Sequence, residues 1–291
     1  MDINLLIAQL LNGLILGMIY VLISIGLTII FSMVGVVNFA HGAFFALGAY
    51  VGLKLKDVIG FWPALILSPI TIGLLGIWVE MTLFRPLYKK HHLFGLFVSF
   101  GLIYVLEDAI RIIWGSQTMP FPTPISLSGT SVVFGLPFSK YRVFILLITI
   151  FILIVVWYLL EKTPYGAIIK AGSRDKEMVD FLGIRTPLVF SLVFGIGCFF
   201  AGLAGILSGP MWGVHPGMGG AIIIVAFVTV VLGGLGSLPG AIIAGIIIGE
   251  VVSISTLFWP PLSEAVIYIV LIIVLLARPR GIMGERWEAF E

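Results

Sequence analysis

The chain of 291 residues is 60% hydrophobic and only 10% charged, with a mean hydropathy of +1.20. Soluble domains average about 45–50% apolar and about 25% charged residues, so this composition excludes a soluble enzyme and a disordered chain. The formal net charge of +2 does not suggest nucleic-acid binding. We therefore expect an all-α, polytopic transmembrane helix bundle, with residues 1–291 forming a single domain in the lipid bilayer.

Nine apolar segments are candidates for membrane spans, each of which needs about 20 apolar residues. They cover residues 3–31, 34–53, 61–80, 93–114, 143–160, 188–208, 221–232, 240–257 and 262–277. The seventh is short and ends in glycine, so we expect half of a broken helix there. If residues 34–53 enter the membrane and return to the same side, the chain has eight spans instead of nine.

The placement of positive charge predicts the orientation of these spans. Eleven of the 16 Lys and Arg residues fall in three stretches: Arg85, Lys89 and Lys90; Lys162, Lys170, Arg174, Lys176 and Arg185; Arg278, Arg280 and Arg286. Cytoplasmic loops are enriched in Lys and Arg, so all three stretches are predicted to face the cytoplasm. Nine spans then put the N-terminus and the loop at residues 115–139 outside; eight spans put the N-terminus inside.

A polar group of residues begins the second segment. On a helix, Asn38, His41 and Phe45 would share one face. Polar residues at membrane depth are costly and usually face a bundle interior or a water-filled path. Either this face lines a translocation path, or Asn38 caps the helix and His41 lies near the headgroup boundary; the residues alone leave both open.

The largest polar loop covers residues 161–187. From about residue 167 to residue 182 its pattern fits an amphipathic helix that ends at Gly183. Such a helix would lie along the cytoplasmic face, where it either docks into a groove of a partner or rests, solvated, on the lipid surface.

A glycine-rich stretch connects the seventh and eighth segments. Gly233, Gly234 and Gly236 stand close together and Pro239 follows them. This pattern predicts a non-helical connection, which is either the boundary of a half-helix aimed at a polar solute or a tight cytoplasmic turn. Small residues at four-residue spacing elsewhere, such as Ala241, Gly245 and Gly249, indicate close helix packing.

Three acidic residues stand inside or near apolar segments. Glu107 and Arg111 are four residues apart and are predicted to form an ion pair, with Asp108 beside them. Glu250 has no partner in its own segment, so it is either protonated, paired across helices or facing water.

Catalytic, metal and cofactor chemistry find no support in the sequence. The single cysteine, Cys198, cannot form an internal disulfide or a metal cluster. The histidines do not occur in a metalloprotease or nucleophile-elbow pattern, and no phosphate-binding loop of the GxxxxGK[ST] form occurs. The chain is therefore predicted not to be an enzyme, and any ATP site must belong to another subunit.

Four blocks of sequence carry a resemblance to a known family. Residues 26–42, which include Asn38 and His41, are the first; residues 171–184, 231–241 and 278–282 follow in order. Together they resemble the permease subunits of bacterial branched-chain amino acid ABC importers, the LivH/LivM permease family, and the LivH type is expected.

The resemblance implies a coupling role for the polar loop. ABC importer permeases carry a cytoplasmic loop, EAAxxxG in its common form, that docks on the ATPase. Here Glu177 and Gly183 keep that spacing, while Met178 and Val179 replace the alanines. The implied coupling residues are Arg174, Asp175, Glu177, Asp180 and Gly183. The candidate path residues come from the polar and glycine-rich features described above and are Asn38, His41, Phe45, Gly233, Gly234, Gly236 and Glu250.

The resemblance also implies partners, location and substrate class. It implies two ABC ATPase subunits, a second homologous permease and a periplasmic solute-binding protein, with this chain a multi-pass protein of the bacterial inner membrane. Similar permeases import urea or short amides, so these solutes are alternatives to branched-chain or other small amino acids. From the residues alone, a self-contained ion-coupled transporter that uses Glu250 and His41 is the rival reading.

Overall fold

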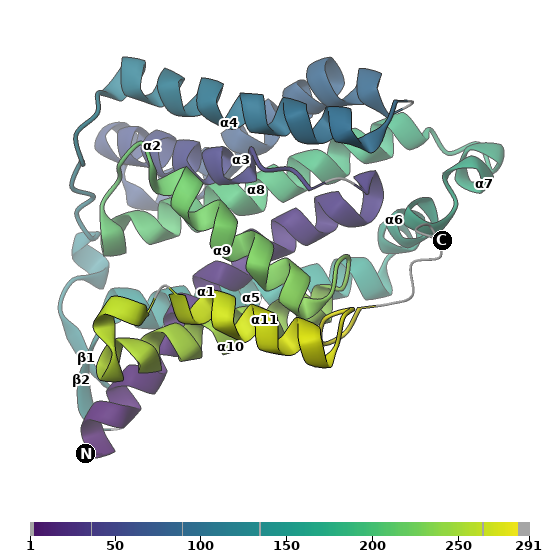
Figure 1. The fold of residues 1–291 in the computed structure, drawn as a ribbon. Helices are drawn as coiled ribbons and strands as arrows, with labels where there is room; N and C mark the ends of the chain where they lie inside the picture. Colours follow the sequence, from purple (N-terminus) through teal and green to yellow (C-terminus); the bar gives the residue numbers. More distant parts are fainter. Residues whose placement is uncertain (1–2, 36, 89, 134, 264, 285–291) are drawn as a thin grey trace. The chain divides into compact units, whose positions relative to one another are not determined.

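The computed structural model describes residues 3–35, 37–88, 90–133, 135–263 and 265–284. Lys89 and Arg286 of the basic stretches therefore lie outside the described residues, as do the side chains of Arg174, Lys176 and Glu177. The described part contains α1 (Ile3–Val34), α2 (His41–Ile59), α3 (Phe61–Val79), α4 (His92–Trp114), α5 (Lys140–Lys162), α6 (Pro164–Arg174), α7 (Lys176–Phe181), α8 (Thr186–Trp212), α9 (Met218–Gly233), α10 (Leu238–Phe258) and α11 (Ala265–Ala277), all visible in Figure 1.

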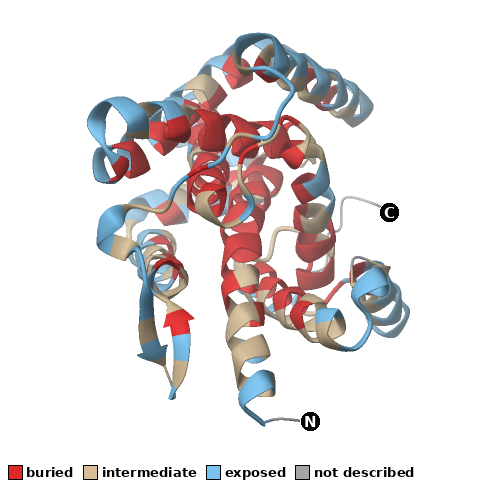
Figure 2. Cartoon of the chain, turned by 90° about the vertical axis from the view of Figure 1, so that its left-hand side faces the viewer, coloured by how far each residue is buried: buried red, intermediate tan, exposed pale blue. Residues whose placement is uncertain are grey.

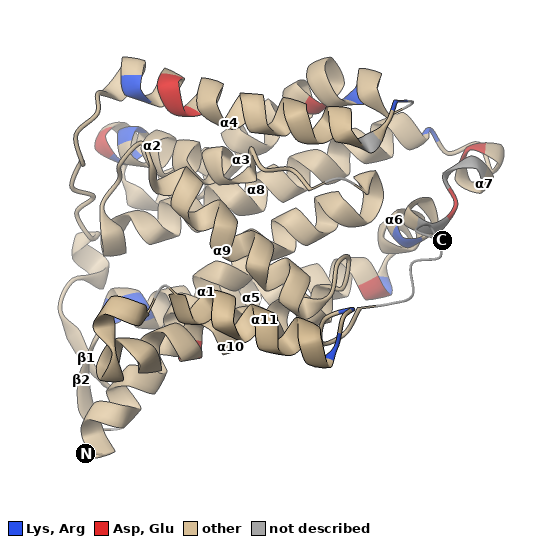
Figure 3. Ribbon diagram, in the orientation of Figure 1, with Lys and Arg blue, Asp and Glu red and all other residues tan. Residues whose placement is uncertain are grey.

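The predicted all-α polytopic membrane protein is confirmed. Each of the nine apolar segments has a counterpart among α1–α5 and α8–α11. Six helical stretches in the described part are long and apolar enough to cross a membrane: α1, the stretch Phe61–Leu87 that begins with α3, α4, α5, α8 and α10. The helices α9 and α11 are apolar but shorter. Figure 3 shows the charged residues mostly near helix ends and in connections, which leaves most helix centres uncharged.

The start of α2 differs from the prediction. Gly35 at φ +69° follows the last turn of α1, and α2 begins only at His41. Residues 37–40 are not helical. Asn38 therefore precedes the helix, and its predicted place on a helical face with His41 and Phe45 is wrong. A left-handed glycine ends a helix readily, and this break delays the next helix by several residues.

The loop at residues 115–139 contains a feature that the all-α reading missed. The strands β1 (Thr130–Val133) and β2 (Leu136–Ser139) pair antiparallel, with Thr130 opposite Ser139 and Val133 opposite Leu136. Gly135 at φ +80° lies in the turn between them. The hairpin is preceded by a 3₁₀ turn at Ile125–Leu127.

Contacts within the chain divide it into two compact units. Unit 1 comprises Met1–Thr28, Pro122–Thr149 and Ile224–Glu291, and unit 2 comprises Ile29–Phe121 and Ile150–Ile223. One boundary falls in the loop between α4 and β1, and the other three fall inside α1, α5 and α9, so these three helices contribute to both units.

In unit 2, α2, α3 and α8 pack at the distance of backbone contact. Gly48 of α2 lies directly against Gly202 of α8, and Gly205 lies against the carbonyl oxygen of Phe45. The hydroxyl of Ser68 in α3 donates a 2.7 Å hydrogen bond to the carbonyl oxygen of Gly48. Such close approach is how helices gain van der Waals contact in lipid, where burying apolar side chains against each other provides little.

In unit 1, the first half of α1 packs against α10 in the same way. Gly249 lies against Gly17, and Gly245 lies against Val21. The hydroxyl of Ser253 donates a 2.7 Å hydrogen bond to the carbonyl oxygen of Gln9. The small-residue stripe at Gly245 and Gly249 therefore serves helix packing, as predicted. Figure 2 shows α1 passing from exposed turns near the N-terminus to buried ones further along.

The glycine contacts predict different outcomes for two helical glycines of unit 2. A Cβ atom at Gly205 would overlap the Phe45 carbonyl, whereas one at Gly101 of α4 would have no atom of the described residues within 4 Å. Gly205→Leu should destabilise the protein by about 1–3 kcal/mol through overpacking. Gly101→Leu should be neutral or stabilising by up to about 1 kcal/mol because leucine is the better helix former. Thermal denaturation of the detergent-purified variants measures both effects; equal melting temperatures would contradict the packing described here.

Candidate functional site

The polar loop between α5 and α8 forms two helices in place of the single one predicted for residues 167–182. Thr163 caps α6, and its hydroxyl accepts a hydrogen bond from the amide of Gly166. Asp175 then interrupts the helix: its carboxylate accepts a 2.9 Å hydrogen bond from the amide of Met178 and so caps α7. A capping aspartate favours a new helix start over continuation, which is why the single-helix prediction is wrong. The predicted end at Gly183 is confirmed, with φ +81°.

Asp180 connects α7 to the start of α8. Its carboxylate accepts hydrogen bonds from the backbone amide and the hydroxyl of Thr186, at 3.2 and 2.8 Å. Thr186 is the first residue of α8. Of the predicted coupling residues, Asp175 and Asp180 thus have defined local roles, whereas the side chains of Arg174 and Glu177 lie outside the described part of the chain.

The end of α7 presents an exposed apolar edge. Met178 is 57%, Phe181 85% and Leu182 71% exposed, while Val179 between them is buried. Large apolar side chains gathered on a short polar loop indicate a binding surface more often than isolated ones do. The loop therefore offers an anchored helix with an apolar edge to a partner or to lipid.

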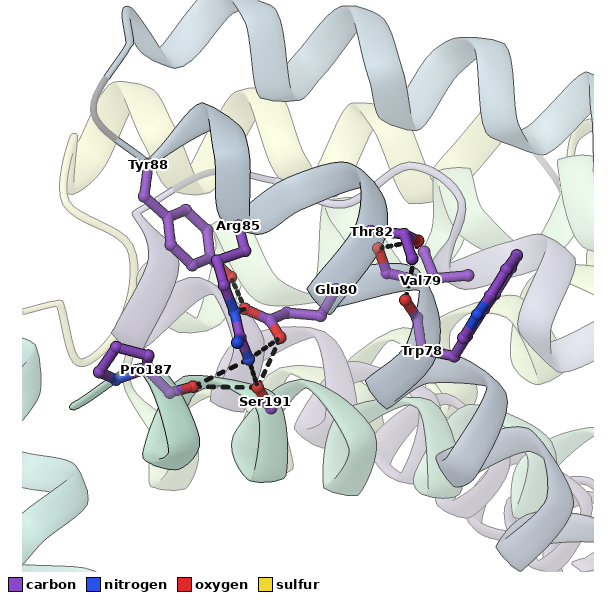
Figure 4. A network of polar contacts seen from close by, with 8 residues as sticks. All are labelled: Trp78, Val79, Glu80, Thr82, Arg85, Tyr88, Pro187 and Ser191. Atoms are coloured by element: carbon purple, nitrogen blue, oxygen red, sulfur yellow. Dashed lines mark hydrogen bonds and ion pairs between the residues drawn. The ribbon is translucent and has the colours of Figure 1, made fainter. Parts of the chain in front are cut away.

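A buried ion pair lies at the end of α3, in a place that the sequence analysis did not single out. Glu80 is fully buried. Its Oε2 lies 3.1 Å from Nη2 of Arg85, its Oε1 accepts a 3.0 Å hydrogen bond from the hydroxyl of Tyr88, and its Oε2 accepts a 2.6 Å hydrogen bond from the hydroxyl of Ser191 (Figure 4). The signal in the sequence is an acid that ends an apolar run five residues before an arginine.

Tyr88 stays a hydrogen-bond donor in this cluster. Burial is the main factor that raises the pKa of its hydroxyl well above the usual range, and the negative charge of Glu80 raises it further. A neutral phenol keeps its proton and donates a hydrogen bond to the carboxylate beside it, so every described polar contact of Glu80 is with a donor.

The turn before α2 contains a buried amide. Asn38 is 1% exposed, and neither its side-chain oxygen nor its nitrogen has a hydrogen-bond partner among the described residues. Ala40 is the cap residue of α2 and no side chain caps this helix, so the alternative in which Asn38 caps it is wrong. His41 and Phe45 follow on one buried face of α2. Whether Asn38, His41 and Phe45 line a path stays a prediction.

The glycine-rich connection forms a tight turn that the C-terminal segment completes. Gly234 and Gly236 adopt φ +105° and +80°. The amides of Ile282 and Met283 donate hydrogen bonds of 2.8 and 2.9 Å to the carbonyl oxygens of Leu232 and Gly233 at the end of α9. The segment after α11 thus satisfies carbonyls that a helix end leaves open. A role of Gly233, Gly234 and Gly236 in the path stays a prediction.

The remaining acids have contrasting surroundings. Glu107 and Arg111 form the predicted ion pair at 2.5 Å, and Asp108 lies 3.2 Å from the same guanidinium. Glu250 lies beside Gly13 of α1, and its Oε2 has no hydrogen-bond partner among the described residues. The three alternatives for Glu250 stay open.

Comparison with known proteins identifies the family. The family model described as "Branched-chain amino acid transport system / permease component" matches residues 9–275. The chain belongs to this permease family. It is 30% identical to the high-affinity branched-chain amino acid transport system permease protein BraD of Pseudomonas aeruginosa, over 95% of each chain. It is also 30% identical to the LivH permease protein of Salmonella typhimurium, again over 95% of each chain.

A more distant similarity extends to LivM of Escherichia coli, at 26% identity over 80% of this chain and 60% of LivM. No solved structure matches the chain. The matched relatives are permease proteins of transport systems, not enzymes, and the apolar helices make this family member a multi-pass membrane protein.

The buried amide of Asn38 predicts a separation of stability from activity. An unpartnered buried polar group costs about 1–3 kcal/mol, so Asn38→Leu should leave the melting temperature unchanged or raise it. Ser68→Ala, which removes a buried hydrogen bond that is satisfied, should lower stability by about 1 kcal/mol. If Asn38 lines the path, its variant also loses uptake. A large drop in melting temperature for Asn38→Leu would show that the amide has a structural partner.

Proposed function

We propose that this chain is the membrane permease subunit of an ATP-driven ABC importer for branched-chain amino acids. The observation that carries the proposal is the family match over residues 9–275, together with branched-chain amino acid permease proteins that match over 95% of each chain. The chain would form part of the path, and ATP would be hydrolysed on two separate ATPase subunits. A periplasmic binding protein would deliver the solute to the outer loops.

The similarity to both LivH and LivM supports a pair of homologous permeases. Two related chains in one transport system fit a heterodimer whose halves surround a shared path. Residues 161–187 of this chain would contact one ATPase on the cytoplasmic side.

The geometry of this coupling segment supports that contact. The exposed Met178, Phe181 and Leu182 provide an apolar edge, and Asp180 anchors the segment to α8. A helix that presents apolar anchors on a charged background suits a groove in a partner. ATP binding and hydrolysis would move α7, and that motion would bias the permease between states open to either side of the membrane.

The basic residues support the orientation. Arg85 donates a 3.4 Å hydrogen bond to the carbonyl oxygen of Pro187, so the first basic stretch and the end of the second lie at the same end of unit 2. By the positive-inside rule this end would be cytoplasmic. With all nine apolar segments crossing the inner membrane, the N-terminus would then lie outside; with residues 34–53 returning to the same side, it would lie inside.

Reconstitution tests the substrate and the energy source together. The purified complex of both permeases and both ATPases, in proteoliposomes that receive the binding protein, should accumulate radiolabelled leucine only when ATP is present. Competition by unlabelled isoleucine, valine, urea and acetamide then ranks the solutes. If urea or acetamide inhibits leucine uptake more strongly than isoleucine and valine do, the substrate class would be short amides. Uptake without ATP that an uncoupler abolishes would contradict the proposal and favour an ion-coupled carrier.

The coupling segment also makes a prediction about one charge. Glu177→Lys should lower ATPase binding and transport by at least about tenfold, because it reverses a charge at the docking helix, while the melting temperature stays the same. Asp57→Lys is the matched control, since Asp57 near the end of α2 is exposed, pairs with Lys56 across the surface and lies outside residues 161–187. Normal transport and ATPase activity in the Glu177 variant would show that Glu177 is not part of the docking site.

A further inference from the structure

We propose that Glu80, Arg85 and Ser191 form a clamp that carries the motion of the coupling segment into α3, which makes them positioning residues for transport. The inference rests on the proposed function, because it assigns a transmitting role to contacts beside the coupling segment. All residues involved belong to unit 2. Figure 4 shows the cluster, with Arg85 and Glu80 on one side and Ser191 and Pro187 on the other.

The first step concerns the local backbone. Residues Glu80–Phe84 form a π-helical turn, in which the amide of Arg85 bonds to the carbonyl of Glu80. In an α-helix, side chains five residues apart do not face each other; those three or four apart do. The π-turn brings the side chains of Glu80 and Arg85 together. Such turns are uncommon and frequently mark functional positions.

The second step concerns charge. Glu80 is fully buried, and a buried carboxylate is tolerated only when it is paired and hydrogen-bonded. Arg85, Tyr88 and Ser191 together supply donors to both of its oxygens. Arg85 is therefore held against Glu80, because its loss would leave a buried charge without its counter-ion in an apolar environment.

The third step concerns what the cluster joins. The guanidinium of Arg85 also donates to the hydroxyl of Ser191 and, at 3.4 Å, to the carbonyl oxygen of Pro187. Both acceptors lie in the first turns of α8. The residue that begins α8, Thr186, is held by Asp180 of the coupling segment. One connected series of hydrogen bonds and short helical turns thus runs from α7 through the start of α8 to the end of α3.

The consequence is mechanical. When a partner displaces α7, Asp180 moves the start of α8, and the clamp moves the end of α3 with it. Without the clamp, the start of α8 could shift against α3, and part of the motion would be lost before it reached the rest of unit 2. ATP hydrolysis would then continue with less solute moved per cycle.

Two substitutions that each remove a single hydroxyl group separate this role from a general effect on stability. Ser191→Ala removes the hydroxyl that joins α8 to Glu80 and Arg85. Tyr88→Phe also removes one hydroxyl donor of Glu80, but that donor lies in the segment between α3 and α4, and its hydrogen bond does not join α3 to α8. The ring contact of Tyr88 with Phe190 of α8 is kept in this variant. Each variant is measured in the complete complex in proteoliposomes, by leucine uptake and ATP hydrolysis in the same sample.

The expected result is a fall in the ratio of leucine transported to ATP hydrolysed, by roughly tenfold for Ser191→Ala, the change expected when a hydrogen bond to a charged group is lost. Tyr88→Phe should keep the wild-type ratio. Arg85→Lys keeps the positive charge but lacks the forked guanidinium that contacts both Glu80 and α8. This variant should lower the ratio as Ser191→Ala does. Arg111→Lys, the same change in the ion pair of α4, should leave it unaltered.

Three outcomes would overturn the clamp. One is a wild-type ratio in Ser191→Ala and Arg85→Lys. Another is an equal fall of the ratio in Ser191→Ala and Tyr88→Phe, and the third is a parallel loss of melting temperature, uptake and hydrolysis at constant ratio. A wild-type complex that transports leucine without any dependence on ATP would overturn the proposed function as well, and this result is seen before any variant is made.

Discussion

The fold depends on one constraint: inside a bilayer, helices cannot gain stability by burying apolar side chains against each other, because lipid is equally apolar. What remains is close contact between backbones and the satisfaction of polar groups within the protein. The contacts of Gly48 with Gly202, and of Gly249 with Gly17, meet this constraint with backbones that touch. Glycine is abundant in the sequence because only residues without a side chain allow backbones to approach this closely.

The same constraint makes the few buried polar groups of the membrane-spanning part informative about function. Glu80 is buried with a donor for each oxygen. By contrast, neither the side-chain amide of Asn38 nor Oε2 of Glu250 has a hydrogen-bond partner among the described residues. A polar cluster in which every group is hydrogen-bonded holds its helices in one arrangement. A buried polar group without a hydrogen-bond partner lowers the stability of the protein. We interpret the first kind as a device for transmitting motion and the second as a candidate contact for a polar solute.

The long apolar helices follow from composition, because a run of some 20 apolar residues has few alternatives to crossing a membrane. The ion pair of Glu107 and Arg111 was predictable for a similar reason, since both residues lie on one helical face. The division of the coupling segment at Asp175 was not predicted, because a local cap competes with an amphipathic pattern that continues through it. The contact of Glu80 with Ser191 could not be found from spacing, since Ser191 lies 111 residues further along the chain.

The central claim is that this permease works in a complex driven by separate ATPases. The most direct test is a mild-detergent purification of the tagged full chain from its native membrane, with the co-purified proteins identified by mass spectrometry. The account predicts recovery of ATPases with phosphate-binding loops and of a second hydrophobic permease. Recovery of this chain alone, from a preparation in which a control membrane complex stays intact, would contradict it.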